Sequence, residues 1–548
     1  MCMLNRKDFY MANSNNKPKP AKKRQVSLAG TVVNLYLLLM FAVFPLFVQV
    51  FANAKPPFLH FDNGFYGIRH EKLYFFCAIS AVAVIAEIMV LLINLGSTKK
   101  ESSLKIKPIS VTDWAALTLL FVCAVSTIFS PHPLLALLGE WSGVGRNNGL
   151  LLILAYVLVY FLITRLFEFS ELPFIGMAIG CGLVYLLTVL NGFYVDPLNM
   201  FAEFENNEQV YTEFLATIGN KNMLSSFICV TLPVVLSMSV HTERLWARIL
   251  YLVSTVLGGA AVIICDSDSC LLGIGVFLAV FLVVYLRDLD KLKRFLLAVT
   301  CLISGVALLR GFSALMNDNY KKLADDSKAI LYSNATLIAL GVAAVLTALV
   351  WLVSAKKTGL MLPKAAPIAL ASVFGAAVLA ALGALLYFSV FDTETKLGSL
   401  EKVLRMNDAW GTHRGIMWLR SFKIFGEANI FQKLFGTGPD TFYYAFEPYF
   451  KELQNYGNSS TDAAHNEYLN YLITIGVFGL GAYLTFMGNA LRRAFLAAKQ
   501  TPAVLAVAAG VVGYAAQAVL NISVPISAPL MIIMIALCEA FARQSNNN

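Results

Sequence analysis

Charged residues are scarce in this chain, and their scarcity sets its structural class. Asp, Glu, Lys and Arg make up 14% of the 548 residues, whereas hydrophobic residues make up 58%, and the mean hydropathy is +0.68. The apolar runs are about 18 to 25 residues long, the length of helix that crosses a hydrocarbon core of about 30 Å. The composition excludes a soluble globular protein and predicts an all-α polytopic membrane protein with about 12–14 transmembrane helices.

Paired cysteines are also missing. None of the nine cysteines belongs to a Cys-x-x-Cys pair, and the longest polar loop contains no cysteine. A disulfide framework and a zinc site are therefore not expected, and the cysteines should pack as small hydrophobic residues. The N-terminal 27 residues are polar and basic, with no apolar stretch before Val32. A cleaved signal peptide is not expected either, so the first span should remain as an anchor.

The basic residues follow the positive-inside pattern. If the N-terminus is cytoplasmic, the cytoplasmic segments hold 25 of the 42 Lys and Arg residues. Both termini are therefore predicted to be cytoplasmic, and topology rather than nucleic-acid binding explains the net charge of +9. The predicted regions are a cytoplasmic basic tail (1–27), a transmembrane helical region of about 11 spans (28–391), a large extracytoplasmic loop (392–464), C-terminal transmembrane helices (465–543) and a cytoplasmic tail (544–548).

The loop at 392–464 is much longer than a connection between two membrane helices requires. Its middle part predicts an amphipathic helix that carries Arg414 and Trp418 on one face. Five Lys or Arg residues lie between positions 402 and 423, against a single acid. Such a cationic strip favours a lipid diphosphate, because guanidinium groups bind phosphate oxygens through paired hydrogen bonds. A helix that lies in the membrane interface is the alternative.

Two earlier outer loops contain further candidates. Arg146 lies in a glycine-rich segment, 139–149, just before an apolar run. It is either a phosphate-binding residue or an anchor at the membrane interface. The sequence Gly-Asn-Lys-Asn at 219–222 precedes another apolar run. Such a turn leaves backbone N–H groups free at a helix N-terminus, where they attract anions, although an ordinary Asn cap has the same sequence.

His465 lies at the start of the apolar run that follows the long loop. A helix N-terminus disfavours the imidazolium, so the ring should stay neutral and able to accept a proton. Asp462, three residues earlier, could cap the helix or orient the ring. The alternative is a structural histidine at the membrane interface.

Together these segments resemble the O-antigen ligase and Wzy polymerase superfamily. His465-Asn466, nine residues and then Gly476-Val-Phe-Gly479 is similar to the family signature His-[Asn/Ser/Gln]-x9-Gly-x-x-[Gly/Thr/Tyr]. Arg414-x3-Trp418 and the segment LFGTGPDTF, with Gly436 and Gly438, resemble the start of the family's large outer loop. The resemblance covers roughly residues 130 to 525, because Arg146 and the 219–222 turn occur in the family's order.

The resemblance implies a GT-C-like fold and an inverting, metal-independent glycosyl transfer in the bacterial cytoplasmic membrane. The donor would be an undecaprenyl-diphosphate-linked glycan, and the acceptor a hydroxyl of a carbohydrate, lipid-linked or protein molecule at the outer face. No cofactor, metal or nucleic-acid partner is implied, and membrane lipids surround the protein. The implied catalytic residues are His465, Arg414 and Arg146; the implied substrate-binding residues are Asn220, Lys221, Asn222, Asn466, Trp418, Gly436 and Gly438.

The chain departs from the family pattern at two places. Glu213 stands where relatives often carry an Arg, and Lys221 replaces the Pro of their Gly-Asn-Pro-Asn turn. One diphosphate-binding arginine is therefore in doubt, with Lys221 as a substitute. The family's Ser-Arg near a later span is replaced by Asp266-Ser-Asp268-Ser. That spacing is weak evidence for a metal site.

Several functions remain compatible with the sequence. A ligase, a Wzy-type polysaccharide polymerase and a protein O-oligosaccharyltransferase share this catalytic half and differ in the acceptor. A lipid-linked glycan flippase or transporter is the alternative of another class. Carriers need polar sites near the bilayer midplane, but the main ionisable residues inside predicted spans are Glu87 and Arg310, and no internal repeat is visible.

Overall fold

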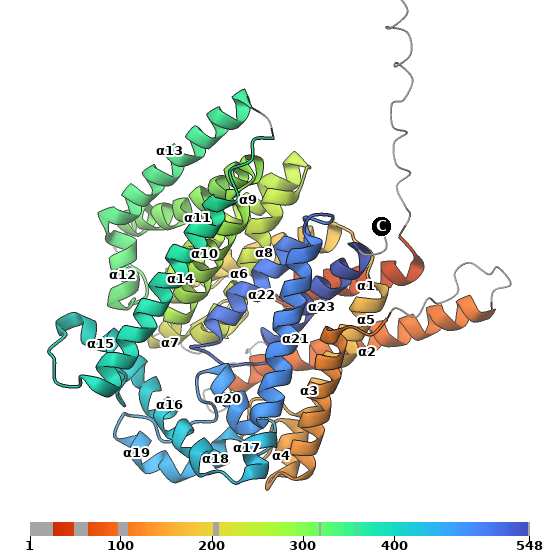
Figure 1. The fold of residues 1–548 in the computed structure, drawn as a ribbon, viewed down its shortest axis with the longest axis vertical. Helices are drawn as coiled ribbons and strands as arrows, with labels where there is room; N and C mark the ends of the chain where they lie inside the picture. Colours follow the sequence, from red (N-terminus) through yellow and green to blue (C-terminus); the bar gives the residue numbers. More distant parts are fainter. Residues whose placement is uncertain are drawn as a thin grey trace, which may run out of the picture.

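The fold is described from a computed structural model. It covers residues 26–48, 64–96, 108–200, 208–316, 319–357 and 359–545. Most of the predicted N-terminal tail and the last three residues of the C-terminal tail lie outside these residues, as does the end of the first predicted span. Figure 1 shows an assembly of long helices, with a group of short helices at one end.

The membrane region is built from helices. In chain order they are α1 (Leu28–Leu38) continued by the π-helix Leu39–Val43, α2 (Gly64–Gly96), α3 (Val111–Ile128), α4 (Pro133–Leu138), α5 (Leu150–Leu166), α6 (Leu172–Gly192), α7 (Glu208–Glu213), α8 (Lys221–His241), α9 (Leu245–Cys265), α10 (Asp268–Leu286), α11 (Leu289–Leu315), α12 (Asp325–Tyr332), α13 (Asn334–Lys356) and α14 (Ala365–Leu386) continued by the π-helix Tyr387–Phe391. Two short strands, β1 (Phe214–Leu215) and β2 (Gly219–Asn220), pair antiparallel just before α8.

Ten of the described helices are long and apolar enough to cross a membrane, namely α2, α3, α6, α8, α9, α10, α11, α13, α14 and α23 (Ala528–Ser545). Three further apolar helices are shorter: Leu28–Val43, α5 and α22 (Val504–Gln517). These helices confirm the predicted all-α polytopic membrane protein.

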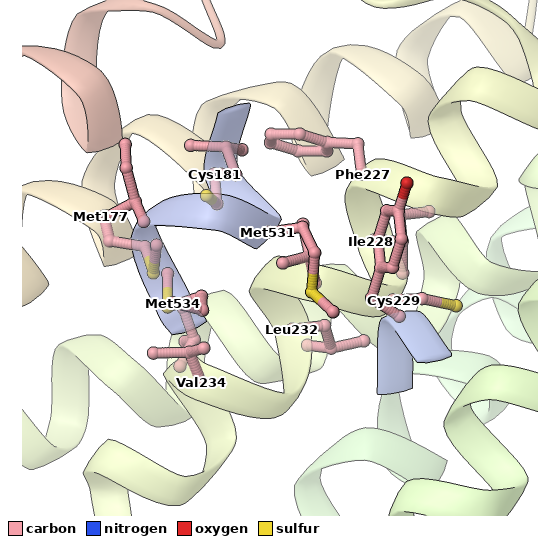
Figure 2. Packing of buried hydrophobic residues seen from close by; sticks show 14 of the residues in the cluster. Met177, Cys181, Phe227, Ile228, Cys229, Leu232, Val234, Met531 and Met534 are labelled. Carbon is pink, nitrogen blue, oxygen red and sulfur yellow. The ribbon is translucent and has the colours of Figure 1, made fainter. Parts of the chain in front are cut away.

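The core lies around α8. Every residue of α8 from Met223 to Val240 is buried, and α8 packs against α9, α10, α11 and α22. Figure 2 shows Phe227, Leu232 and Val234 of α8 in one buried hydrophobic cluster with Met177 of α6 and Met531 of α23. By contrast, α14 has no buried residue. An apolar helix that is exposed on all sides is expected to face lipid.

The segment between α14 and α20 forms a small unit at one end of the molecule (Figure 1). After the 3-10 turn Gly398–Leu400, it contains α15 (Glu401–Leu404), α16 (Trp410–Glu427), α17 (Ile430–Phe435), α18 (Phe442–Phe446), the 3-10 turn Glu447–Tyr449 and α19 (Phe450–Gln454). α16 confirms the predicted amphipathic helix. Ile416 and Met417 of α16 pack with Phe442, Phe446 and Leu469 in a separate hydrophobic cluster. The cluster joins this unit to α20 (Glu467–Thr474), so the segment is a folded element with its own small core.

The apolar run that begins at His465 predicts one membrane helix over residues 465–489, and this prediction is wrong. The structure divides it into α20 and α21 (Gly476–Ala497). The break occurs at Gly476, whose φ is +68° and whose added Cβ would lie 2.4 Å from the carbonyl carbon of Leu434. The end of α17 therefore occupies the space that a continuous helix would need. His465 consequently lies in a turn before a short helix, outside the helices long enough to span a membrane.

Candidate active site

Asp440 joins the Arg146 loop to the Gly436–Gly438 segment. Its Oδ2 accepts hydrogen bonds from the backbone N–H groups of Arg146 at 2.7 Å and Asn148 at 2.8 Å. The side chain is buried, with an exposed fraction of 8%. Burial raises the pKa of Asp440 to about 6, although the two N–H donors lower it in part. Two loops that are distant in sequence are thereby fixed to each other.

Gly436 and Gly438 hold the other side of this junction. Their φ angles are +79° and +119°, a range that L side chains rarely adopt. Between them, Thr437 donates its backbone N–H to the Ile473 carbonyl at 3.1 Å, and the N–H of Gly438 donates to the Thr474 carbonyl at 2.9 Å. A Cβ at Gly436 would lie 2.2 Å from the carbonyl carbon of Thr474. The two glycines therefore allow the backbone to approach α20 closely; their predicted contact with substrate stays a prediction.

The Arg146 side chain forms an ion pair with Asp462. Its Nε donates to Asp462 Oδ1 at 2.7 Å, and a terminal guanidinium nitrogen contacts the same oxygen. The exposed fraction is 14% for the Arg146 side chain and 21% for Asp462. Asp462 is thus paired with Arg146, whereas the cap of α20 is Asn466, whose Oδ1 accepts the backbone N–H of Leu469 at 3.0 Å. This cap is the role that the structure gives to Asn466.

Arg414 is buried without a carboxylate partner among the described residues. It lies in α16 after Gly411, Thr412 and His413, which all have left-handed φ and ψ angles and kink the start of the helix. Its exposed fraction is 7%, and one terminal nitrogen donates to the Gly411 carbonyl at 3.1 Å. The Nε has no hydrogen-bond partner in the part of the chain that the structure describes. The charge of Asp268 acts on Arg414 from beyond ion-pair distance. A buried guanidinium without an anion in direct contact is costly, so this environment favours the binding of an external anion.

His465 adopts a left-handed φ of +50°, which is uncommon for a non-glycine residue. It is partly buried and has no hydrogen bond to any of the residues that the structure describes. Its pKa is lowered to about 3, first by burial and then by the positive charges of Arg146 and Arg414, while Asp462 opposes the shift. The ring is therefore neutral at ordinary pH. The three predicted catalytic residues lie close enough for the two arginine charges to act on the imidazole.

Two adjoining cavities lie at this junction. The first, of about 380 Å³, is lined by Arg146, Asn148, Asp440, Asp462, Tyr471 and Ser523, among others. The second, of about 590 Å³, shares Asn148, Tyr471 and Ser523 with it and is mostly apolar. A polar chamber with an arginine at its wall and an apolar continuation suits an amphiphilic ligand.

The turn before α8 lies in a separate polar group. Asn220 caps α8 by accepting the backbone N–H of Asn222 at 2.9 Å, and Lys221 forms an ion pair with Glu213 at 3.0 Å. The carbonyl of Asn222 accepts from Asn521 Nδ2 at 2.6 Å. No hydrogen bond between described residues joins this turn to Arg146, Arg414 or His465. Much of the charge of Lys221 is therefore compensated by Glu213, the residue that replaces the expected arginine.

Two of the five basic residues of the predicted cationic strip, Arg405 and Arg420, form ion pairs with carboxylates. Arg420 forms two hydrogen bonds with Asp408, at 3.1 and 2.9 Å, and one with Glu452 at 2.7 Å. Arg405 pairs with Glu401 at 2.8 Å. The ring centroids of Trp418 and Trp410 lie 5.2 Å apart, with the rings tilted by 55°, and the Trp418 indole N–H is buried without a hydrogen-bond partner among the described residues. Of the arginines in the strip, Arg414 alone lacks a carboxylate partner within the described part of the chain.

Three polar residues near these loops have contacts that the sequence did not predict. Asp440 follows the Gly-Thr-Gly-Pro segment, a position that signals a turn but not its partner. Asp462 was interpreted as a cap or a ring-orienting residue. Lys321 is fully buried; its Nζ lies 3.4 Å from the Thr212 carbonyl, and burial lowers its pKa to about 8. The sequence contains no signal for Lys321, because it lies in an ordinary polar loop.

The two acids of the Asp266-x-Asp268 pair lie in different environments. Asp266 accepts the backbone N–H of Ala324 at 3.1 Å with both carboxylate oxygens, whereas Asp268 is exposed. Within the described residues, no group of three or more His, Cys, Asp or Glu side chains is arranged to hold a metal ion.

Comparison with known families adds a direct observation. Residues 327–484 match the family model described as O-antigen ligase. This region belongs to the O-antigen ligase family. The matched part contains Arg414, Trp418, Gly436, Gly438 and the His465-Asn466 signature up to Gly479, whereas Arg146 and the 219–222 turn precede it. No curated protein matches the chain.

The O-antigen ligase match confirms the resemblance drawn from the signature. The apolar helices show a multi-pass membrane protein, and its residues 327–484 match the O-antigen ligase family. The match supports an enzyme of the ligase or glycosyltransferase type. The α15–α19 unit that packs on α20 lies entirely inside the matched region.

Proposed function

We propose that the protein transfers a glycan from an undecaprenyl-diphosphate carrier to an acceptor hydroxyl at the outer face of the bacterial cytoplasmic membrane. Transfer inverts the anomeric configuration and requires no metal. The observation that carries the proposal is Arg414, a guanidinium with an exposed fraction of 7% and no carboxylate partner among the described residues. Such a group favours a multiply charged anion, and a lipid diphosphate supplies one.

Arg414 and Arg146 would bind the diphosphate, whose negative charge grows as the bond to the sugar C1 carbon breaks. Interactions that strengthen as charge develops lower the barrier more than they stabilise the bound substrate. Trp418, Asn220, Lys221 and Asn222 are proposed to bind other parts of the donor, with Lys221 a weak contributor because Glu213 already pairs with it.

His465 would accept the proton of the acceptor hydroxyl as that oxygen attacks C1. The imidazole is neutral in the free protein because its pKa is lowered to about 3, so it is in the form that a general base requires. A diphosphate bound by Arg146 and Arg414 would offset the charges that lower this pKa. Donor binding therefore makes His465 a stronger base at the time when one is needed.

The direct test uses purified protein, an undecaprenyl-diphosphate-linked glycan and a candidate acceptor. We expect released undecaprenyl diphosphate and a product with inverted anomeric configuration, at a rate that EDTA leaves unchanged. Retention of configuration, or loss of the rate in EDTA that added Mg²⁺ restores, would contradict the mechanism.

The acceptor class can be separated in cells by deleting the protein and examining glycans on gels. Accumulation of full-length lipid-linked polymer identifies a ligase, whereas loss of long chains with single repeats retained identifies a polymerase. Loss of glycan from proteins alone identifies an O-oligosaccharyltransferase. Both termini are proposed to be cytoplasmic, which places the α15–α19 unit outside.

A further inference from the structure

The guanidinium of Arg146 is held by a single carboxylate oxygen. Nε donates to Asp462 Oδ1 at 2.7 Å, and a terminal nitrogen contacts the same atom. Asp462 Oδ2 has no hydrogen bond to a residue in the described ranges. Both side chains line the polar cavity, and 21% of the Asp462 side chain is exposed. The pair is therefore incomplete on the cavity side and open to exchange.

The position of the Arg146 loop does not depend on this ion pair. The backbone N–H of Arg146 donates to Asp440. Its neighbour Asn147 donates through Nδ2 to Glu140 Oε2 at 2.7 Å, and the same oxygen contacts His70 Nε2 at 2.5 Å. The loop is thus fixed through its backbone and Asn147, and the Asp462 contact determines only where the guanidinium points.

Arg420 provides a contrast within the same outer unit. Its guanidinium is satisfied by both oxygens of Asp408 and by Glu452, so three nitrogens are engaged by three oxygens. Arg146 has one oxygen for two nitrogens, and Arg414 has no carboxylate within the described part of the chain. Of the three arginines compared, the two assigned to the diphosphate, Arg146 and Arg414, are the incompletely paired ones.

We propose that Asp462 binds the Arg146 guanidinium in the free protein as an internal competitor, and that the diphosphate of the donor displaces it. The inference rests on the proposed function and assigns a specificity role to a residue outside the assigned catalytic set. A diphosphate offers the guanidinium two oxygens and more negative charge than one carboxylate, so it displaces Asp462 from Arg146, whereas a weakly charged anion does not. The apparent affinity for the diphosphate is reduced because only the fraction of protein in which Asp462 has released Arg146 can bind it.

The test measures the Kd of farnesyl diphosphate, a soluble polyprenyl diphosphate, for detergent-purified full-length protein. Asp462→Asn should bind about fivefold more tightly than the wild type, the gain expected on removing a partly exposed ion pair. Asp408→Asn, which removes the partner of Arg420, should leave the Kd unchanged. In an Arg146→Ala background, Asp462→Asn should have no effect, because the competition requires both groups.

Each outcome decides between exchange and another role. Unchanged or weaker binding by Asp462→Asn would overturn the inference, as would a gain that persists without Arg146, since that gain would reflect long-range charge alone. Loss of folding in both Asp462→Asn and Asp462→Ala would also overturn it by making Asp462 structural. If the wild type shows no saturable binding, the proposed function fails and the inference fails with it. Binding that is normal in the wild type and unaltered by Asp462→Asn contradicts the inference alone.

Discussion

At the scale of residues, reactivity depends on the partners that the fold provides. Arg420 and Arg414 lie six positions apart in α16, yet Arg420 is saturated by Asp408 and Glu452, while Arg414 is buried with no carboxylate within ion-pair distance among the described residues. The sequence predicted Arg414 and His465 as candidates because polar residues near apolar runs are rare in this chain and because both lie in segments that resemble the O-antigen ligase family. It did not identify the Arg146–Asp462 pair, since 316 residues separate the two partners and no pattern specifies the distance between them.

The pH dependence of kcat/KM tests the environment of His465. Its folded-state pKa of about 3 lies below the ordinary value, so the neutral base is present at pH 8 and is lost only as pH falls toward 3. The titration of His465 should therefore leave kcat/KM constant between pH 8 and pH 5. Protonation of Asp440, whose pKa is about 6, should add a second break to the pH profile of kcat/KM, and Asp440→Asn should remove that break. A decline with an apparent pKa near 6.5 that persists in Asp440→Asn would contradict the environment described for His465.

At the scale of elements, the junction of α17, α20 and α21 is built by backbone contact. The amphipathic pattern of α16 was predictable from residue spacing, because one face had to bury Ile416 and Met417. The break between α20 and α21 was not, because the apolar run continues through Gly476 and nothing local shows that α17 fills the adjoining space. Local periodicity specifies a helix, but a distant segment decides where it ends.

Gly436 tests that junction. We expect Gly436→Ala to lower stability by about 2 kcal/mol or more, because it combines a φ of +79° with a Cβ 2.2 Å from backbone. Gly426→Ala is the matched control: nothing lies within 4 Å of the added Cβ in α16, so its stability should be equal or higher, by up to about 1 kcal/mol. The measurement is the Tm of each purified protein. An unchanged Tm with lost activity in Gly436→Ala would instead indicate a direct contact with substrate.

At the scale of the whole molecule, the polar loops collect at one end of an apolar bundle. Composition alone predicted the fold class, because a chain that is 58% hydrophobic with repeated long apolar runs has few alternatives. Burial divides the helices in a way that hydropathy could not: α8 is enclosed and α14 has no buried residue, although both are apolar enough to cross a membrane. Which helix lies at the centre depends on packing partners.

Topology makes a separate prediction. Asn458→Cys, in the loop after α19, should react in intact cells with a maleimide that cannot cross the membrane, whereas Lys356→Cys at the end of α13 should react only after lysis. The expected contrast is tenfold or greater, because the bilayer excludes a charged reagent. The background is set by the nine natural cysteines, of which the eight described are buried or partly buried. Equal labelling at both positions, or the reverse pattern, would contradict the orientation.

The central claim is that Arg414 and His465 belong to one active site for glycan transfer. The most direct measurement is the rate of undecaprenyl diphosphate release from the lipid-linked glycan, with acceptor present, for the wild type and four purified variants. His465→Ala and Arg414→Ala should each lose about 100-fold or more, and the double variant should lose little beyond that. Arg420→Ala, from the same helix, should stay within about threefold of the wild type, because its pairing with Asp408 and Glu452 is structural. A wild-type rate in His465→Ala or in Arg414→Ala, with all variants folded, would contradict the account.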